Sequence, residues 1–230
     1  PYGTYIGLVA ERFYDISDFD NAGNLKEGIP TPSFGSVQPG DVKYSDLDEN
    51  GVVDQNDITQ IGKSVYPEWY YSFGGKIGFK GFDLEVLFQG AAGASVNLLD
   101  NWNQTVAFVN NGNAYEIAKG AWAYYPTEGI DTRATARYPR LTTQSNENNY
   151  QTSSMWIKSA DYLKLRNLEL GYNFNTIKLQ KAGIENLRIY LSGHNLATFS
   201  GLLKHYNLDP ERISGYPTVR SYNVGVSITF

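Results

Sequence analysis

The last nine residues, which read YNVGVSITF, alternate strictly between apolar side chains and small or polar ones. Successive side chains of a β-strand point to opposite faces, so this segment predicts a strand with one apolar face and one polar, uncharged face. A soluble β-sandwich produces such strands. A membrane β-barrel requires them, because its outer face meets lipid while its inner face meets a wet lumen.

The chain stops on an aromatic strand residue, which resembles the carboxy-terminal signal that bacterial outer-membrane proteins present to their assembly machinery. The candidate assembly-signal residues are Tyr222, Val224, Val226, Ile228 and Phe230. Aromatic residues make up 14% of the chain, which fits the aromatic girdles of a membrane barrel. Since no apolar run approaches the length of a transmembrane helix, any spanning structure must be built from strands.

Composition excludes several classes of function. The net charge is −5 and the basic residues form no cluster, so nucleic acid is not an expected partner. Cysteine is absent, which removes disulfides and thiolate chemistry. His194 and His205 lack a metal-ligand spacing, and neither a G-x-S-x-G elbow nor a P-loop occurs, so we expect no enzyme. The opening Pro1-Tyr2-Gly3 has no signal-peptide character and indicates mid-protein sequence.

The clearest local prediction is a β-hairpin that turns at Lys80-Gly81. A two-residue turn there pairs residue 79 with 82, 77 with 84, 75 with 86 and 73 with 88. Each of those positions is apolar or glycine, so the turn and the register agree.

Four further segments complete the expected layout. Strands are predicted over 2–14, 156–174 and 186–198 besides the terminal one, and a short turn ending at Gly183 over 175–183. Within 156–174 the apolar phase slips between Leu165 and Leu168, which indicates either a bulge or a strand top that leaves the membrane.

Residues 15–66 and 95–154 are expected to be long loops, the second with a short helix near Glu116–Trp122. Six long strands joined alternately by long and short connections are typical of an outer-membrane barrel with long extracellular loops and short periplasmic turns. Six strands cannot close such a barrel, so the chain is expected to be the end of a larger one.

Residues 46–57, DLDENGVVDQND, have the spacing of a calcium-binding loop. The expected ligands are Asp46, Asp48, Asn50, the carbonyl group of Val52, Asp54 and Asp57. Gly51 allows the sharp turn that such a loop needs, and the oxygen ligands suit Ca²⁺. The alternative is a surface turn that satisfies its own hydrogen bonds through Asp and Asn side chains.

The order of several segments resembles the SusC/RagA family of TonB-dependent outer-membrane transporters of Bacteroidota. The segments that carry the resemblance are PYGTYIGLVAERFY, QPGDVKYSDLDENGVVDQND, KGFDLEVLFQG, SADYLKLRNLELGYNF, AGIENLRIYLSGHNLATFS, LDPE and YNVGVSITF. The resemblance covers essentially the whole chain. It implies an all-β fold in which residues 1–230 form the last six strands of a roughly 22-stranded transmembrane antiparallel barrel, without the plug domain.

The resemblance also implies import of glycans, oligosaccharides or peptides across the bacterial outer membrane. A SusD-like surface lipoprotein is the implied lid, and the TonB–ExbB–ExbD complex the implied energy source, engaged through a part of the protein before Pro1. The alternative is a soluble, calcium-stabilised β-sandwich that binds carbohydrate. Aromatic residues in the loops, such as Trp102 and Trp122, either contact a substrate or lid or anchor in the lipid headgroups. The sequence assigns no substrate-binding residue.

Overall fold

The computed structural model describes residues 2–174, 179, 181 and 183–230, which form two compact units. The sheet unit comprises Pro67–Ala94, Ala160–Lys204 and Leu208–Phe230. The loop unit comprises Pro1–Tyr66, Ser95–Ser159 and His205–Asn207. The regular structure of both units is mainly β-strand and short 3₁₀ helix, which agrees with the all-β class expected from the sequence.

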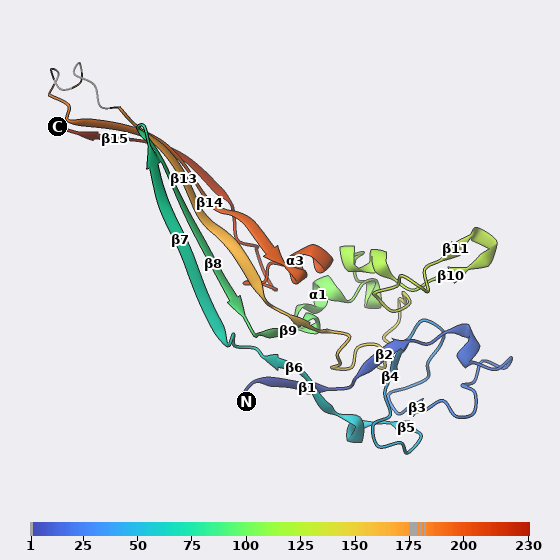
Figure 1. Ribbon diagram of the computed structural model, residues 1–230. Helices are drawn as coiled ribbons and strands as arrows, with labels where there is room; N and C mark the ends of the chain where they lie inside the picture. The colour runs from blue at the N-terminus through green and yellow to red at the C-terminus, as the bar shows by residue number, and fades with distance from the viewer. Residues whose placement is uncertain (1, 175–178, 180, 182) are drawn as a thin grey trace. The chain divides into compact units, whose positions relative to one another are not determined.

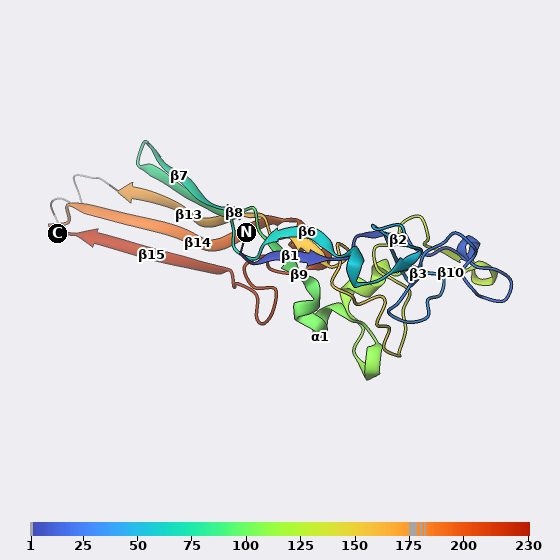
Figure 2. The same ribbon diagram turned by 90° about the horizontal axis from the view of Figure 1, so that it is seen from below.

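The sheet unit contains one antiparallel sheet of five long strands. They are β7 (Trp69–Phe79), β8 (Phe82–Ala92), β13 (Tyr162–Phe174), β14 (Asn186–Ser200) and β15 (Ser221–Thr229). Their order across the sheet is β15-β14-β13-β8-β7, and Figures 1 and 2 show them side by side. The strands are 9 to 15 residues long, which is enough for a tilted strand to cross a bilayer.

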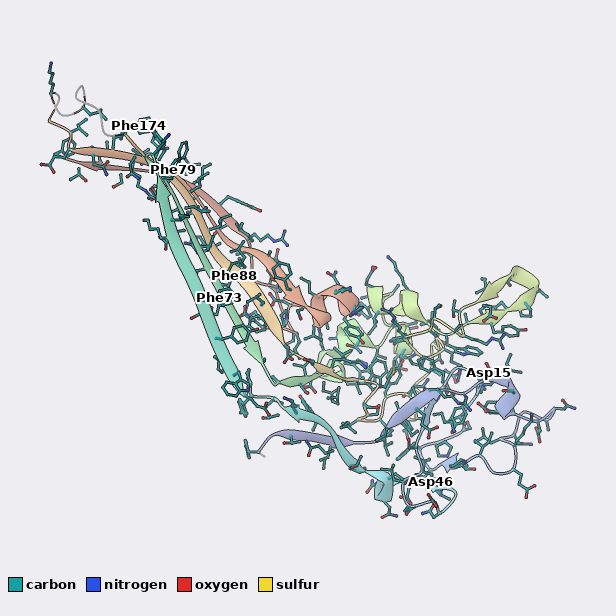
Figure 3. All side chains as sticks on the ribbon, viewed as in Figure 1. Asp15, Asp46, Phe73, Phe79, Phe88 and Phe174 are labelled. Atoms are coloured by element: carbon teal, nitrogen blue, oxygen red, sulfur yellow. The ribbon has the colours of Figure 1, made fainter. Side chains whose placement is uncertain are left out.

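The predicted hairpin is confirmed in its turn and in its register. Phe79 pairs with Phe82 and Phe73 with Phe88, as do the pairs between them. Lys80 and Gly81 both have positive φ, at 49° and 89°, which a two-residue hairpin turn of type I′ requires. The rings of Phe73 and Phe88 stack with centroids 5.2 Å apart (Figure 3).

The phase slip in β13 is a β-bulge. Pairing with both neighbouring strands shifts between Leu165 and Asn167. Relative to β8 the extra residue is Arg166, whereas relative to β14 the extra residue lies on β14, where Asn195 and Leu196 stand opposite Arg166. Leu165 pairs with Phe88 and Leu168 with Val86, so both leucines lie on the same face of the sheet. The bulge thus restores one continuous apolar face, and of the two interpretations of the phase slip the bulge is confirmed.

The turn predicted over 175–183 falls largely outside the described residues. Gly183 is described and has a φ of +78°. Positive φ is the conformation that a glycine adopts when it ends a helical turn.

The loop unit contains short paired strands within long irregular segments. Its antiparallel pairs are β1 (Thr4–Gly7) with β6 (Thr59–Ser64), β2 (Ala10–Phe13) with β4 (Val42–Tyr44), β9 (Ser95–Asn97) with β12 (Ile157–Ser159) and β10 (Tyr124–Tyr125) with β11 (Ile130–Asp131). A parallel pair joins β3 (Thr31–Pro32) to β5 (Val52–Val53). The short helices are η1 (Ile16–Asp18), η2 (Gln55–Asp57), η3 (Leu98–Asn101), α1 (Trp102–Thr105), η4 (Val109–Asn111), η5 (Glu116–Gly120) and η6 (Pro126–Glu128). A further helix, α3 (Gly201–Tyr206), runs from the sheet unit into residues of the loop unit.

The prediction of one long strand over 2–14 is wrong. The segment divides into β1 and β2, which pair with β6 and β4 and not with the five-stranded sheet. The break arises because the backbone N–H of Leu8 donates to the carbonyl of Thr152 at 3.0 Å and that of Ala10 to Ser154 Oγ at 2.9 Å. The described sheet therefore has five long strands instead of the six expected. The short helix predicted near Glu116–Trp122 is confirmed as η5.

An apolar core and a buried asparagine network hold the loop unit together. Leu8, Val42 and Tyr44 are at most 2% exposed and pack in one cluster. Asn148 Nδ2 donates to the carbonyl of Val42 at 2.8 Å, and the Val42 N–H donates to Asn149 Oδ1 at 2.8 Å. The Asn-rich segment near residue 148 thus supplies hydrogen bonds to the edge of β4, because buried backbone groups need partners.

Candidate functional site

The acidic loop in the loop unit brings three carboxylates together. Ligand oxygens of Asp46, Asp48 and Asp57 lie within 4.8 Å of one another, and Figure 3 marks the position of Asp46. Side chains of Asp46 and Asp48 also accept backbone hydrogen bonds from Asn50 at 3.2 Å, and Gly51 donates to Asp46 at 2.8 Å. Gly51 has a φ of +85°, so the sharp turn predicted for position six of the loop is present.

Asp57 is the buried member of this group, with 0% of its surface exposed. Burial raises the pKa of its carboxyl group, but hydrogen bonds from the backbone N–H groups of Asp54, Leu47 and Asp48 outweigh this and hold the pKa below its ordinary value. The pKa of Asp48 is raised, first by desolvation and then by the charges of Asp57 and Asp46. A cation between these oxygens would relieve the repulsion.

The other three expected ligands occupy different positions. The carboxylate of Asp54 caps η2 by accepting the N–H of Asn56 at 2.7 Å, and it is not part of the three-carboxylate group. Asn50 bonds to Asp48 Oδ2 through its amide nitrogen at 2.9 Å and accepts from Val52 N at 2.7 Å. These bonds also belong to the self-satisfied Asx turn that the sequence left open as the alternative.

Four of the five candidate assembly-signal residues, Tyr222, Val224, Val226 and Ile228, lie on the apolar face of the sheet, and Phe230 follows the end of β15. Ile228, Val226 and Val224 pair with Leu187, Ile189 and Leu191 of β14. That row continues onto β13 at Leu170 and Tyr172. Val224 is 75% exposed and Phe230 81% exposed, so this face is covered by no described part of the chain. The paired rows form one apolar surface across the sheet.

The opposite face of the sheet carries a network of charged groups. Arg188 on β14 bonds to Asp83 on β8 at 2.5 Å and to Glu169 on β13 at 2.7 Å. Asn173 donates to the other oxygen of Asp83 at 2.8 Å. A face that is charged and hydrogen-bonded along its length suits a wet lumen.

A second ionic network, which sequence reasoning missed, fixes the segment between α3 and β15. The ammonium group of Lys164, 1% exposed, lies 2.8 Å from Asp209 Oδ1 and 2.6 Å from Glu211 Oε2. Arg166, the bulge residue, pairs with the same Glu211. We call these four residues the latch. The cations of the latch lie in the segment YLKLRN and its acids in LDPE, but neither segment contains a pattern that predicts their pairing.

Burial raises the pKa of Asp209, but hydrogen bonds from the side chains of Lys164 and Thr218 and from the backbone have the larger, opposite effect. The net result is a pKa lowered to about 2. The N–H of Thr218 donates to Asp209 Oδ2 at 3.0 Å, so the latch also fixes the approach to β15. The carboxylate therefore stays charged at neutral and mildly acidic pH.

Among the described residues, no helix is long and apolar enough to cross a membrane. No family model matches the chain. It is 28% identical over 236 residues to TonB-dependent receptor P3 of Formosa agariphila, which covers 94% of this chain and 22% of that protein. It is 25% identical over 207 residues to TonB-dependent receptor P26 of the same organism, covering 83% of this chain and 20% of that protein. The chain thus spans about a fifth of the length of these curated relatives.

Solved structures with the same fold come from the RagAB peptide importer. Its 'open-open' state matches 99% of this chain and 22% of the solved chain, with a TM-score of 0.62 and 19% identity. A further structure of the RagAB peptide transporter matches 99% of this chain and 22% of the solved chain, with a TM-score of 0.65 and 20% identity. TonB-dependent receptors are outer-membrane proteins of Gram-negative bacteria, and their sequences match this chain over most of its length. The resemblance to SusC/RagA-family TonB-dependent transporters of Bacteroidota is therefore confirmed, and the chain is an outer-membrane sequence.

Proposed function

We propose that this chain supplies the last strands of a TonB-dependent outer-membrane importer of peptides, oligosaccharides or glycans. The observation that carries the proposal is the continuous apolar face of the five-stranded sheet, opposite a face that holds Asp83, Glu169 and Arg188. Lipid suits the first face and a wet lumen the second.

The edges of the sheet support the same proposal. β7 and β15 stand at its two ends, and each has one edge without a partner strand in the described chain. In lipid an unpaired backbone group costs several kcal/mol, so we propose that the remaining strands of a larger barrel, of about 22 in all, pair with both edges. The segments of the loop unit would then lie outside the cell.

The soluble sandwich alternative receives no support from the sheet. A sandwich buries the apolar face of one sheet against a second sheet. Here Phe73 is 56% exposed and Ile77 68% exposed, although both lie in the middle of a long strand. Large exposed apolar faces of this kind mark contact with lipid or with a partner.

The first test is the mass and location of the native polypeptide that contains YNVGVSITF. Under the proposal, denaturing gels of the outer-membrane fraction show this epitope in a band several times heavier than 25.7 kDa. Deleting its gene then abolishes growth on one class of oligomer while growth on the monomer continues. A soluble 25.7 kDa band would contradict the proposal and favour an independent domain.

We further propose a SusD-like surface lipoprotein as the partner and TonB–ExbB–ExbD as the energy source, the latter acting through other parts of the polypeptide. The structural likeness to RagAB, a peptide importer, supports this pairing. Affinity purification of the tagged importer should recover a lipoprotein in near-equal amount. Removing TonB should stop uptake without changing that amount.

We also propose that the acidic loop binds structural Ca²⁺ through Asp46, Asp48 and Asp57, with Asn50, Asp54 and the Val52 carbonyl completing the set directly or through water. The support is the grouping of three carboxylates within 4.8 Å. Asp46→Ala with Asp48→Ala should remove one calcium per chain, measured by mass spectrometry of the purified protein. Asp20→Ala is the matched control, because Asp20 is an exposed acid in a similar turn that lies outside the group. Equal calcium in both variants would identify the loop as a self-capped turn.

A further inference from the structure

A cavity of about 550 Å³ opens within the loop unit and has no role in the function proposed above. Its walls come from β2, from the stretch around Trp122 and from Arg133, Arg137, Lys158 and Tyr206. We call it the cationic pocket. The acidic loop is not part of it.

Most charged groups that line the pocket are already paired. Arg12 lies 2.6 Å from Asp18, and Glu11 lies 2.9 Å from Lys43. Arg133 bonds to Asp131 at 2.8 Å and also covers the ring of Tyr124. Asp15, marked in Figure 3, lies 3.5 Å from Arg133.

Two further cations line the pocket, Arg137 and Lys158. In the described part of the chain, neither Arg137 nor Lys158 has a carboxylate within ion-pair distance. Lys158 Nζ donates to the carbonyl oxygen of Ser154 at 3.2 Å, which leaves its charge uncompensated. Burial accordingly lowers the pKa of Lys158. Arg137 Nη1 lies 3.1 Å from Nδ1 of His205, which is not a carboxylate.

The pocket thus offers two unneutralised positive charges in a chain whose net charge is −5. A half-buried cation without a counterion is costly unless a ligand completes it. An anionic group that enters here would gain two charge-assisted hydrogen bonds.

The rest of the wall is largely apolar and is held in place. Its large apolar side chains include Phe13, Met155 and Trp122. The Trp122 ring lies so close to Gly40 that a methyl group there would stand 2.5 Å from Cε3, and the Trp122 N–H donates to the carbonyl of Tyr138 at 2.8 Å. A rigid aromatic wall costs little entropy when a ligand binds.

This combination favours one ligand chemistry. A sugar ring needs several free donors and acceptors for its hydroxyl groups, but the carboxylates that line this pocket, Glu11 and Asp15, already have cationic partners. A peptide end offers a single carboxylate beside an apolar side chain, which matches two cations beside an apolar wall.

We propose that the cationic pocket binds the carboxy-terminal end of a peptide, with Arg137 and Lys158 holding the carboxylate and Trp122, Phe13 and Met155 contacting an apolar last side chain. The inference rests on the proposed importer function and narrows its substrate to peptides. Arg137 is exposed and Lys158 half-buried, so the carboxylate would enter from the open side of the pocket.

The test is calorimetric binding to the full-length polypeptide purified in detergent. The probes are acetyl-Ala-Ala-Phe with a free carboxylate and the same tripeptide with a carboxy-terminal amide. Amidation removes the charge but preserves size and apolarity, so affinity should fall about tenfold or more. Arg137→Gln and Lys158→Met should each weaken binding of the acid by a similar factor and leave binding of the amide unchanged.

Lys119→Gln is the matched control, because Lys119 is an exposed lysine of the same unit that pairs with Glu116 and does not line the pocket. Arg137→Lys retains the charge and should retain most of the affinity. Arg137 is exposed, so its variant keeps the test valid if Lys158→Met fails to fold.

Three results would overturn the proposal: equal binding of acid and amide, no binding by the wild-type protein, or wild-type affinity in both variants. Stronger binding of an oligomer of hexuronic acid, used as a competitor, would also overturn it and assign the cations to an acidic glycan. Failure of the pocket leaves the importer proposal intact if the polypeptide is still a large outer-membrane protein required for uptake.

Discussion

The two units use the same kinds of residue in opposite ways. The loop unit has a core of aromatic and aliphatic side chains, in which Leu8, Val42 and Tyr44 are nearly inaccessible. In the sheet unit, residues of the same kind face outward, and Val224 is 75% exposed. The buried side chains of the sheet unit include a lysine, Lys164, and an aspartate, Asp83.

The difference shows which force organises each unit. An apolar core driven by release of water explains the loop unit. The sheet unit is held by strand pairing and by ion pairs, and its apolar face contributes only when lipid or another apolar phase covers it. Substitutions that remove charge should therefore damage the sheet unit more than substitutions that trim apolar side chains.

The largest expected effect is that of Lys164→Met. It removes the ammonium group that lies within 2.8 Å of Asp209 and Glu211, so that Asp209 loses its cationic partner while Glu211 keeps Arg166. Breaking one partner of a buried ion pair costs about 3–5 kcal/mol. Thermal unfolding in detergent should show a clear loss of stability.

Lys76→Met is the control for this prediction, because Lys76 is on the same polar face but is exposed and lies 3.8 Å from its partners. Exposed pairs are worth about 0–1 kcal/mol. Adding Asp209→Asn to Lys164→Met should recover most of the loss, because Glu211 keeps its pair with Arg166. If the double variant is no more stable than Lys164→Met, charge is not what the pair of Lys164 and Asp209 contributes.

The pH dependence of stability tests whether the charge of Asp209 in the latch stabilises the sheet unit. The pKa of Asp209 is lowered to about 2 in the folded protein, below its ordinary value. A lowered pKa means that the carboxylate contributes stability at pH values above its unfolded pKa of about 3.9, and that this contribution disappears as pH falls toward 2. The difference in melting temperature between the wild type and Asp209→Asn should be constant from pH 7 to pH 5 and should shrink below pH 4. A difference that instead shrinks near neutral pH would rule out this carboxylate as the source.

Asp41→Asn tests the corresponding buried charge of the loop unit. Asp41 is 0% exposed, accepts from the amides of Asn146 and Asn149 at 3.0 and 2.8 Å, and lies 2.7 Å from Arg140 Nε. An amide of the same size places a donor against these donors, at a cost of about 3 kcal/mol. Hydrogen exchange should show loss of protection at the Val42 N–H, which bonds to Asn149. Unchanged protection would mean that the apolar core alone fixes β4.

The sequence predicted the sheet far better than the loop unit, for a physical reason. The register of the β7–β8 hairpin follows from a two-residue turn and a period of two, both of which are local. The contact of Val42 with Asn149 joins residues 107 positions apart, and no local pattern announces it. Polar residues near 148 therefore suggested an open loop although they form a buried scaffold.

The candidate site was predicted in part. The calcium-loop spacing brought Asp46, Asp48 and Asp57 together, because a tight turn at Gly51 dictates which side chains converge. It did not anticipate that Asp54 caps η2. The latch was not predicted, because the strand that holds Lys164 and the loop that holds Asp209 and Glu211 are far apart in the sequence, and no local pattern in either indicates that they pair.

Gly90→Ala is expected to lower the stability less than Lys164→Met or Asp41→Asn does. The ring of Tyr71 lies across Gly90, and its hydroxyl donates to the carbonyl of Tyr162 at 3.0 Å. A methyl group at Gly90 would stand 2.4 Å from that carbonyl oxygen, so the strand or the ring must shift, at a cost of about 1–3 kcal/mol. Gly75→Ala on the same hairpin is the control, because nothing lies within 4 Å of its added methyl. Equal melting temperatures for the two variants would show that Tyr71 does not brace the sheet.

Phe230→Ala should have the smallest effect on the stability of the assembled protein and yet change how much of it is assembled. Phe230 is 81% exposed, so removing its ring deletes few contacts with the described chain. As the last residue of the candidate assembly signal, it should matter when the outer-membrane machinery selects the strand, before the barrel has formed. The amount of heat-modifiable protein in the outer membrane should fall, while the melting temperature of the fraction that does insert stays the same. Ile228→Ala, one step along the same apolar row, separates recognition of the terminal aromatic ring from loss of apolar surface, because it shortens that row but keeps the ring. If both variants insert as well as the wild type, the apolar face of β15 serves lipid contact alone and the signal lies elsewhere.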